Sequence, residues 1–266
     1  MLWQRIISGV ILVPIVVAAV CSGGLALFAL VVAVGLLAGV EYVRMVSGQK
    51  LTPVYLWGLP FIILLIADAQ WPLLDLLSWS LVLVPLAALT LEVFRGNAPG
   101  SLGNWALTVA GALYIGLPIN HVIRLRALDQ GLDWLILAFV GTWVCDTGAY
   151  FVGRTIGRRR FFPAISPKKT WEGAIGGLVT GVITVVLLGW FTLGLGVGWG
   201  IVLGILVVLG ATFGDLAESV IKRQVGAKDS GNLIPGHGGM LDRIDSLLFV
   251  VPIVYYFATV VRFVSR

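Results

Sequence analysis

Long apolar runs, separated by short polar segments, repeat along almost the whole chain. A bilayer core about 30 Å thick is crossed by a helix of roughly 20 apolar residues. The runs predict about nine spanning helices, near residues 6–22, 24–43, 52–68, 73–93, 104–120, 132–152, 172–190, 197–221 and 245–264. The sequence lacks the short alternating segments of a membrane β-barrel. We therefore predict an all-α fold class, a polytopic transmembrane helical bundle.

Composition supports the membrane prediction. The chain is 59% hydrophobic and 12% charged, and its mean hydropathy of +1.01 is far above that of soluble domains. The first apolar run, Ile6–Val20, follows a basic amino terminus, as in a cleaved signal peptide. Val20 is too large for the residue before a cleavage site, and further spans follow, so we expect no cleavage. Cys21 and Cys145 lie in apolar runs without metal-ligand spacing, and no disulfide framework is expected.

Basic residues set the predicted orientation, because cytoplasmic segments of membrane proteins are enriched in Lys and Arg. With the amino terminus inside, the outer segments contain only Arg124, Arg126, Arg262 and Arg266. The inner segments contain the other 14 of the 18 basic residues. We therefore predict a cytoplasmic amino terminus and an outside carboxyl terminus. The net charge of +5 is explained by this bias and by attraction to anionic membrane lipid, so no nucleic-acid partner is expected.

The two halves of the chain differ in polar content. Residues 1–120 are poor in polar groups and are predicted to form a transmembrane scaffold or an oligomer interface, which leaves a homodimer open. Residues 121–266 are predicted to form a transmembrane catalytic region with two cytoplasmic loops, 153–171 and 222–244. No soluble domain is present, so any function must reside in membrane helices and these loops.

Four acids lie in or at the edge of predicted spans, and ionisable groups at such depth mark functional sites by default. Helical spacing places each on a stripe with other candidate residues: Asp146 with Tyr150 and Gly153, Asp215 with Ser219 and Lys222, and Asp242 with Asp245 and Ser246. Carboxylates from separate helices form a hard oxygen site, which suits Mg²⁺ with one or two carboxylates plus substrate phosphates. A Cys/His zinc site is excluded, because the ligands are too few.

The first loop, GRTIGRRRFFPAISPKKTWEG, contains six basic residues: Arg154, Arg158, Arg159, Arg160, Lys168 and Lys169. A helix is expected to begin there, with Ser166 as the N-cap before Pro167 or, alternatively, with Thr170 as the N-cap and Glu172 in the first turn. In either case a helix amino terminus lies beside two lysines, which is a ready phosphate-binding arrangement.

The second loop ends in KDSGNLIPGHGGMLDRID, residues 228–245. Gly236, Gly238 and Gly239 allow positive φ or a close approach of backbone to a ligand. His237 stands among these glycines and is placed to contact a phosphate. Positive charge comes from Lys222, Arg223, Lys228 and Arg243. Together these residues indicate a pocket for a polyphosphate and a metal ion at the inner membrane surface.

The run Ser219–Asp245, SVIKRQVGAKDSGNLIPGHGGMLDRID, resembles the signature of the phosphatidate cytidylyltransferase (CDP-diacylglycerol synthase) family without interruption. Upstream, Asp146 with Tyr150, Gly153–Arg154, SPKKTWEG at Ser166–Gly173 and Gly214–Asp215 resemble the family too. The likeness in motifs covers roughly residues 146–246. One departure is Arg158, where lysine is expected.

The resemblance implies that CTP and phosphatidate react to give CDP-diacylglycerol and pyrophosphate, in a bacterial-type cytoplasmic membrane, with Mg²⁺ required and a second cation left open. The expected catalytic residues are Asp215, Asp242, Asp245, Lys222, Arg243 and His237, and the first three are the expected metal ligands. The expected substrate-binding residues are Asp146, Tyr150, Arg154, Ser166, Lys168, Lys169, Thr170, Ser219, Arg223, Lys228, Asp229, Gly238 and Gly239.

Several other functions are open to a chain of this kind. A polyprenol kinase or an archaeal-type lipid cytidylyltransferase also uses CTP, but the uninterrupted Ser219–Asp245 likeness argues against the kinases. A CDP-alcohol phosphotransferase would have a D-x-x-D-G-x-x-A-R cluster, which is absent from the sequence. A transporter predicts acids distributed through the bilayer, whereas here the acids gather toward the inner ends of three predicted helices.

Overall fold

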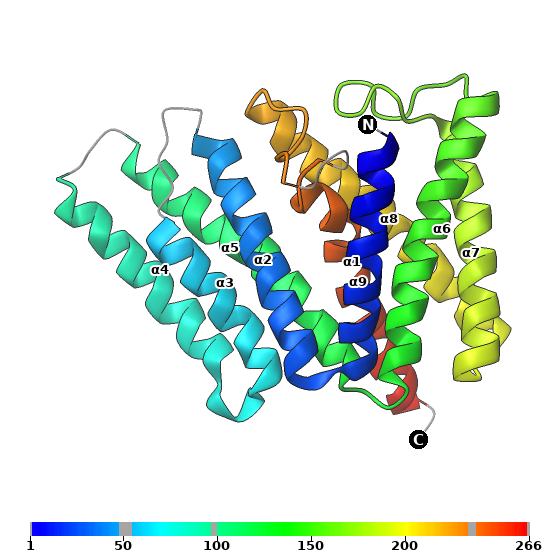
Figure 1. The fold of residues 1–266 in the computed structure, drawn as a ribbon, viewed down its shortest axis with the longest axis horizontal. Coiled ribbons are helices and arrows are strands. Elements are labelled where there is room, and N and C mark those ends of the chain that lie inside the picture. The colour runs from blue at the N-terminus through cyan, green and yellow to red at the C-terminus, as the bar shows by residue number, and fades with distance from the viewer. Residues whose placement is uncertain (1, 48–54, 97–99, 234–237, 265–266) are drawn as a thin grey trace. The chain divides into compact units, whose positions relative to one another are not determined.

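The structure is a computed structural model, and it describes residues 2–47, 55–96, 100–233 and 238–264. Within these ranges the chain forms nine α-helices and one short 3₁₀ helix (Figure 1). In chain order they are α1 (Leu2–Ser22), α2 (Gly24–Val46), α3 (Tyr55–Gln70), η2 (Pro72–Leu74), α4 (Leu76–Phe94), α5 (Ser101–Arg126), α6 (Gly131–Ile156), α7 (Trp171–Leu193), α8 (Val197–Gln224) and α9 (Leu241–Val264).

The helices confirm the predicted all-α bundle, because each of the nine predicted spans coincides with one helix. Seven of them, α2 and α4 to α9, are long and apolar enough to cross a membrane. The apolar parts of α1 and α3, Leu12–Ser22 and Trp57–Gln70, are shorter. An isolated antiparallel bridge joins Arg160 and Thr170.

Contacts divide the chain into two compact units. The first unit is Met1–Arg124 with Gln224–Arg243, so it joins α1 to α5 to the segment between α8 and α9. The second unit is Leu125–Arg223 with Ile244–Arg266, and it contains α6, α7, nearly all of α8 and most of α9. The predicted division at residue 120 into scaffold and catalytic region concerns roles, and it stays a prediction.

In the first unit, α2 packs against α1 and α3, and α3 packs against α4. Glycines allow these helices to approach closely: a Cβ added at Gly39 of α2 would lie 2.6 Å from Ile62 Cδ1 of α3. At the opposite end of α3, the buried Asp68 forms an ion pair with the part-exposed Arg124, in which Asp68 Oδ2 lies 2.5 Å from Arg124 Nη2. Small residues at helix contacts are typical of membrane bundles.

In the second unit, α6 and α7 lie side by side along their length (Figure 1). Gly177 of α7 lies against Cys145 of α6, and a Cβ there would be 3.0 Å from the Cys145 carbonyl oxygen. Gly204 of α8 lies equally close to α7, and Gly214 of α8 lies against Asp245 of α9. The glycine contacts therefore bring α6, α7, α8 and α9 together, three of which contain candidate acids.

Candidate active site

The contact between α8 and α9 places two candidate carboxylates next to each other. A Cβ added at Gly214 would lie 2.7 Å from the Asp245 carbonyl oxygen and 2.9 Å from Ser246 Cα, so only glycine fits there. The Ser246 hydroxyl donates to the Ala211 carbonyl at 3.2 Å and fixes the same contact. Because Asp215 follows Gly214 directly, its carboxylate is brought to the start of α9.

Three carboxylates from three helices gather in the second unit. Asp146 of α6 lies close enough to Asp215 of α8 and Asp245 of α9 for their charges to interact. Lys169 Nζ lies 2.8 Å from Asp215 Oδ2 and also interacts with Asp146. The Lys169 and Asp215 side chains are 27% and 35% exposed, so both remain accessible to a ligand. The cluster thus combines accessible carboxylates with a lysine ammonium group that a ligand can displace.

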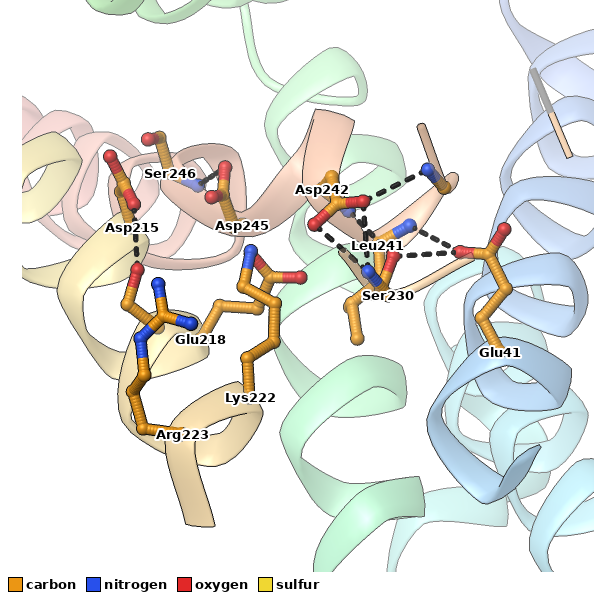
Figure 2. Close-up of polar contacts among 12 residues, drawn as sticks. Glu41, Asp215, Glu218, Lys222, Arg223, Ser230, Leu241, Asp242, Asp245 and Ser246 are labelled. Carbon is orange, nitrogen blue, oxygen red and sulfur yellow. Dashed lines mark hydrogen bonds and ion pairs between the residues drawn. The ribbon is translucent and has the colours of Figure 1, made fainter. Parts of the chain in front are cut away.

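The last turns of α8 add a second layer of polar contacts (Figure 2). The Ser219 hydroxyl donates to Asp215 Oδ1 at 3.3 Å, and Lys222 Nζ lies 2.6 Å from Glu218 Oε2. Glu218 is fully buried and Lys222 is buried. Glu218 is a residue that the sequence reasoning missed. Its signal was its place in an apolar helix, four residues before a lysine.

The loop before α7 settles the two capping alternatives. Gly173 N donates to Thr170 Oγ1 at 3.1 Å, so Thr170 is the N-cap of α7. The Ser166 alternative is wrong: Ser166 lies in a turn, where its carbonyl accepts from Lys169 N at 3.2 Å, and no helix begins there. A turn at Ser166–Lys169 delays the helix until Trp171.

The same loop is tied to the neighbouring segments. The Glu172 carboxylate accepts from the Arg158 and Arg159 backbone amides. Arg223 Nε, in the last turn of α8, donates to the Ile165 carbonyl at 3.2 Å. The second unit thereby brings the loop containing Lys169 to the end of α8.

Other predicted residues are exposed or lie beyond the described ranges. Arg154 donates to the Tyr150 hydroxyl at 2.7 Å, and both side chains are exposed. A further four predicted residues are exposed: Lys168, Lys228, Asp229 and Arg243. His237 and Gly236 lie outside the described residues, so the prediction for His237 stays a prediction.

In the first unit, the Asp242 carboxylate accepts hydrogen bonds from the backbone amides of Ser230 and Gly239 (Figure 2). Its Oδ2 accepts from Ser230 N at 3.0 Å and from Gly239 N at 2.9 Å, and its Oδ1 lies 3.2 Å from Ser230 N. Gly238 has φ +83°, which confirms the expected positive φ. The close approach that Gly239 permits is to Ser230 and Glu41 side chains. The glycines therefore shape the loop around Asp242.

Glu41 of α2 completes this network and was missed by the sequence reasoning. Its Oε2 accepts from the Ser230 hydroxyl at 3.2 Å and from Leu241 N at 2.9 Å. The residue is only 4% exposed. In the sequence it is a single acid in an apolar run, and nothing near it in the chain indicates its distant partners.

The donor chemistry of the accessible acids fits a hard divalent cation such as Mg²⁺. Within the described ranges, no group of three or more His, Cys, Asp or Glu side chains is arranged to hold a metal ion. The observation in favour is that a cationic group, the Lys169 ammonium, already lies 2.8 Å from Asp215 Oδ2. Mg²⁺ in such sites needs only one or two carboxylates, because substrate phosphates and water complete its shell.

Comparison with known proteins points to one family. The chain matches the cytidylyltransferase family over residues 3–261. A phosphatidate cytidylyltransferase of Bacillus subtilis (strain 168) is 37% identical over 265 residues, which is 95% of this chain and 96% of that protein. A phosphatidate cytidylyltransferase of Brucella suis biovar 1 is 33% identical over 265 residues, which is 97% of this chain and 94% of that protein. One of Haemophilus influenzae is 43% identical over 150 residues, 52% of each chain.

Proposed function

Because the chain belongs to the cytidylyltransferase family, we propose that it transfers CMP from CTP to phosphatidate and so produces CDP-diacylglycerol and pyrophosphate. The observation that carries this function is the match of nearly the whole chain to relatives named phosphatidate cytidylyltransferase. It fits the second unit, where accessible carboxylates lie beside lysines in a chain with seven helices able to cross a membrane.

The reaction needs no protein nucleophile. A phosphate oxygen of phosphatidate forms a bond to the α-phosphorus of CTP, and the bond from that phosphorus to the oxygen bridging the β-phosphate breaks. Pyrophosphate leaves with the electron pair of the broken bond. Both reactants are anions, so catalysis depends on positioning and on neutralising phosphate charge.

Basic side chains of the second unit do most of this work. Lys169 is paired with Asp215, and its part-exposed side chain can turn toward a phosphate of CTP. Lys168 and Arg223 bind phosphates from the same loop and helix end, and Lys222 is held for that role by Glu218. Arg243 stabilises the leaving pyrophosphate, and Ser219 orients Asp215.

Asp215, Asp242 and Asp245 are the ligands we propose for Mg²⁺, with a second cation left open. Support comes from the carboxylate chemistry, from the contact at Gly214 that brings Asp215 to Asp245, and from the one-turn spacing of Asp242 and Asp245 along α9. When bound, the cation would neutralise charge on the phosphates and position them for transfer. Asp146 supports this group from α6.

The chain is an integral membrane protein, and we propose that it resides in a bacterial cytoplasmic membrane. The amino terminus and the active site face the cytoplasm in this proposal, and the carboxyl terminus lies outside. The support is the concentration of basic residues in the predicted inner segments. A homodimer stays a prediction.

Labelled CTP tests the proposed reaction. Purified protein is mixed with phosphatidate in detergent micelles and with CTP labelled on either the α- or the γ-phosphate. We expect the α-label in the lipid fraction, one pyrophosphate released per CDP-diacylglycerol formed, and loss of transfer when a chelator removes divalent cations. Entry of the γ-label into lipid would instead establish a kinase and overturn the proposal.

A further inference from the structure

We propose that Glu41 of α2 is a positioning residue that fixes Asp242 at the start of α9. What Asp242 does once fixed rests on the proposed function. Glu41 and Asp242 belong to the same compact unit, and Figure 2 shows Ser230 between them.

Glu41 receives a pair of hydrogen bonds through one carboxylate oxygen. Its Oε2 accepts from Leu241 N at 2.9 Å, across a separation of 200 residues. Leu241 is the first residue of α9, and the first amides of a helix have no partner within the helix. Glu41 therefore supplies from α2 a negatively charged cap for α9, at the end where the helix dipole favours an anion.

Ser230 links Glu41 to Asp242. The Ser230 hydroxyl donates to Glu41 Oε2 at 3.2 Å and accepts from Asp242 N at 3.3 Å. The Ser230 amide donates to Asp242 Oδ2 at 3.0 Å. A displacement of Glu41 would therefore reach both the backbone and the carboxylate of Asp242.

The loop backbone packs tightly against this link. A Cβ added at Gly231 would lie 2.7 Å from Glu41 Oε1, and one at Gly239 would lie 2.1 Å from the Ser230 hydroxyl oxygen. The loop backbone is thus closed over Glu41. Close packing transmits a change in one side chain to its neighbours.

Burial distinguishes positioning from substrate contact. Glu41 is 4% exposed, so a nucleotide or lipid phosphate cannot reach it. Its Oε1 receives no hydrogen bond from the described residues, and a buried oxygen without a donor is costly. An apolar side chain would fill this place at less cost, so the carboxylate serves the two bonds at Oε2.

The test compares Glu41→Ala and Glu41→Gln with Glu92→Gln. Glu92 is a matched control: it is 5% exposed, belongs to the same unit, and is paired with Arg95. Two measurements are made on the full chain in detergent: amide hydrogen exchange of peptides covering residues 228–243, and the kcat and KM for CMP transfer over a range of Mg²⁺ concentrations.

We expect Glu41→Ala to speed exchange in residues 228–243 and to lower kcat about 10- to 100-fold, the usual cost of losing a group that orients a metal ligand. The Mg²⁺ concentration for half-maximal rate should rise as well, which a purely structural defect would not cause. Glu41→Gln should recover most of both effects, because its carbonyl oxygen accepts the same two hydrogen bonds. Glu92→Gln should leave the exchange of this segment unchanged.

A second variant guards against a Glu41→Ala protein that fails to fold. Ser230→Ala keeps Glu41 but removes the link, and it should loosen the same segment in the same direction. Unchanged exchange in residues 228–243 in both variants, or equal loosening by Glu92→Gln, would overturn the proposal. If the wild-type protein transfers no CMP, the proposed function fails, and the exchange measurement still decides whether Glu41 positions Asp242.

Discussion

The two compact units hold their carboxylates in different ways. In the first, Glu41 and Asp242 accept hydrogen bonds from backbone amides and a serine hydroxyl. In the second, Asp215 and Glu218 are paired with the ammonium groups of Lys169 and Lys222. A backbone amide cannot move away from its carboxylate unless the loop opens, whereas a lysine side chain can turn from its carboxylate toward a phosphate. The first arrangement suits a fixed frame, and the second suits charges that are rearranged when a substrate binds.

The same acids also differ in how far they are buried. Glu41 and Glu218 are buried: Glu218 contacts Lys222 directly, and Glu41 is linked to Asp242 through Ser230. Asp215, Asp242 and Asp245 are only partly buried, so they can meet a ligand. The longer, buried acids therefore act as supports, and the shorter, accessible acids are the ones proposed to bind a cation.

The largest expected effect is on the accessible acid of α8. Asp215→Asn should lower turnover about 10²- to 10³-fold, because the several kcal/mol that a bound cation supplies to the transition state are lost. Its ion pair with Lys169 is part-exposed and contributes only about 0–1 kcal/mol, so stability should hardly change. Turnover and thermal unfolding in detergent check both points. Normal turnover would show that Asp215 is not needed for transfer.

The buried pair of α8 should separate stability from activity. Lys222→Met leaves Glu218 buried without its nearest cation, which costs about 3–5 kcal/mol of stability. The double variant Glu218→Gln with Lys222→Met should regain most of the melting temperature but none of the activity, because the phosphate contact stays absent. Thermal unfolding and CMP transfer on both variants provide the measurement. Recovery of activity in the double variant would contradict the phosphate-binding role of Lys222.

A substitution at the α8–α9 contact should have an effect of intermediate size on stability and activity. Gly214→Ala adds a Cβ that would lie 2.7 Å from the Asp245 carbonyl oxygen, and a clash with backbone costs about 1–3 kcal/mol. Gly198→Ala is the control, since a Cβ there meets no atom within 4 Å. We expect the first variant alone to lower the melting temperature and the rate of transfer. Equal behaviour of the two would show that the contact does not set the site.

The smallest effect concerns the cap of α7. Thr170→Ala removes the acceptor for Gly173 N and should cost about 1 kcal/mol of stability, whereas Thr170→Ser keeps the oxygen and should not. The melting temperature measures the cap, and the KM for CTP measures any contact with nucleotide. A raised KM in both variants, with stability retained in the serine variant, would indicate a substrate contact by the Thr170 methyl group instead.

Much of the fold followed from the sequence, because a spanning helix is defined locally by a run of apolar residues. The stripes on α8 were also predictable, since spacing along one helix places Asp215 and Ser219 on the same face. The Thr170 cap was one of two local alternatives. A turn at Ser166, held by a hydrogen bond from Lys169 N, decides between the two capping alternatives. Neither capping motif reveals this turn on its own.

The buried acids that hold other residues in place could not be predicted from the sequence, and the reason is physical. Glu41 reaches partners 189 and 200 residues away, and helix periodicity carries no information about such contacts. Glu218 looked like one more helical acid, because its burial results from tertiary packing that helical spacing does not reveal. Sequence patterns point to residues that could bind ligands, whereas the residues that hold them in place emerge only from packing.

The most direct test of the account is a Mg²⁺ titration of CMP transfer from α-labelled CTP to phosphatidate, comparing wild type, Asp245→Asn and Glu92→Gln. The account predicts transfer that requires Mg²⁺, a half-maximal Mg²⁺ concentration raised about tenfold or more in Asp245→Asn, and a wild-type curve for Glu92→Gln. Transfer that proceeds without any divalent cation, or an Asp245→Asn curve that overlies the wild type, would contradict it.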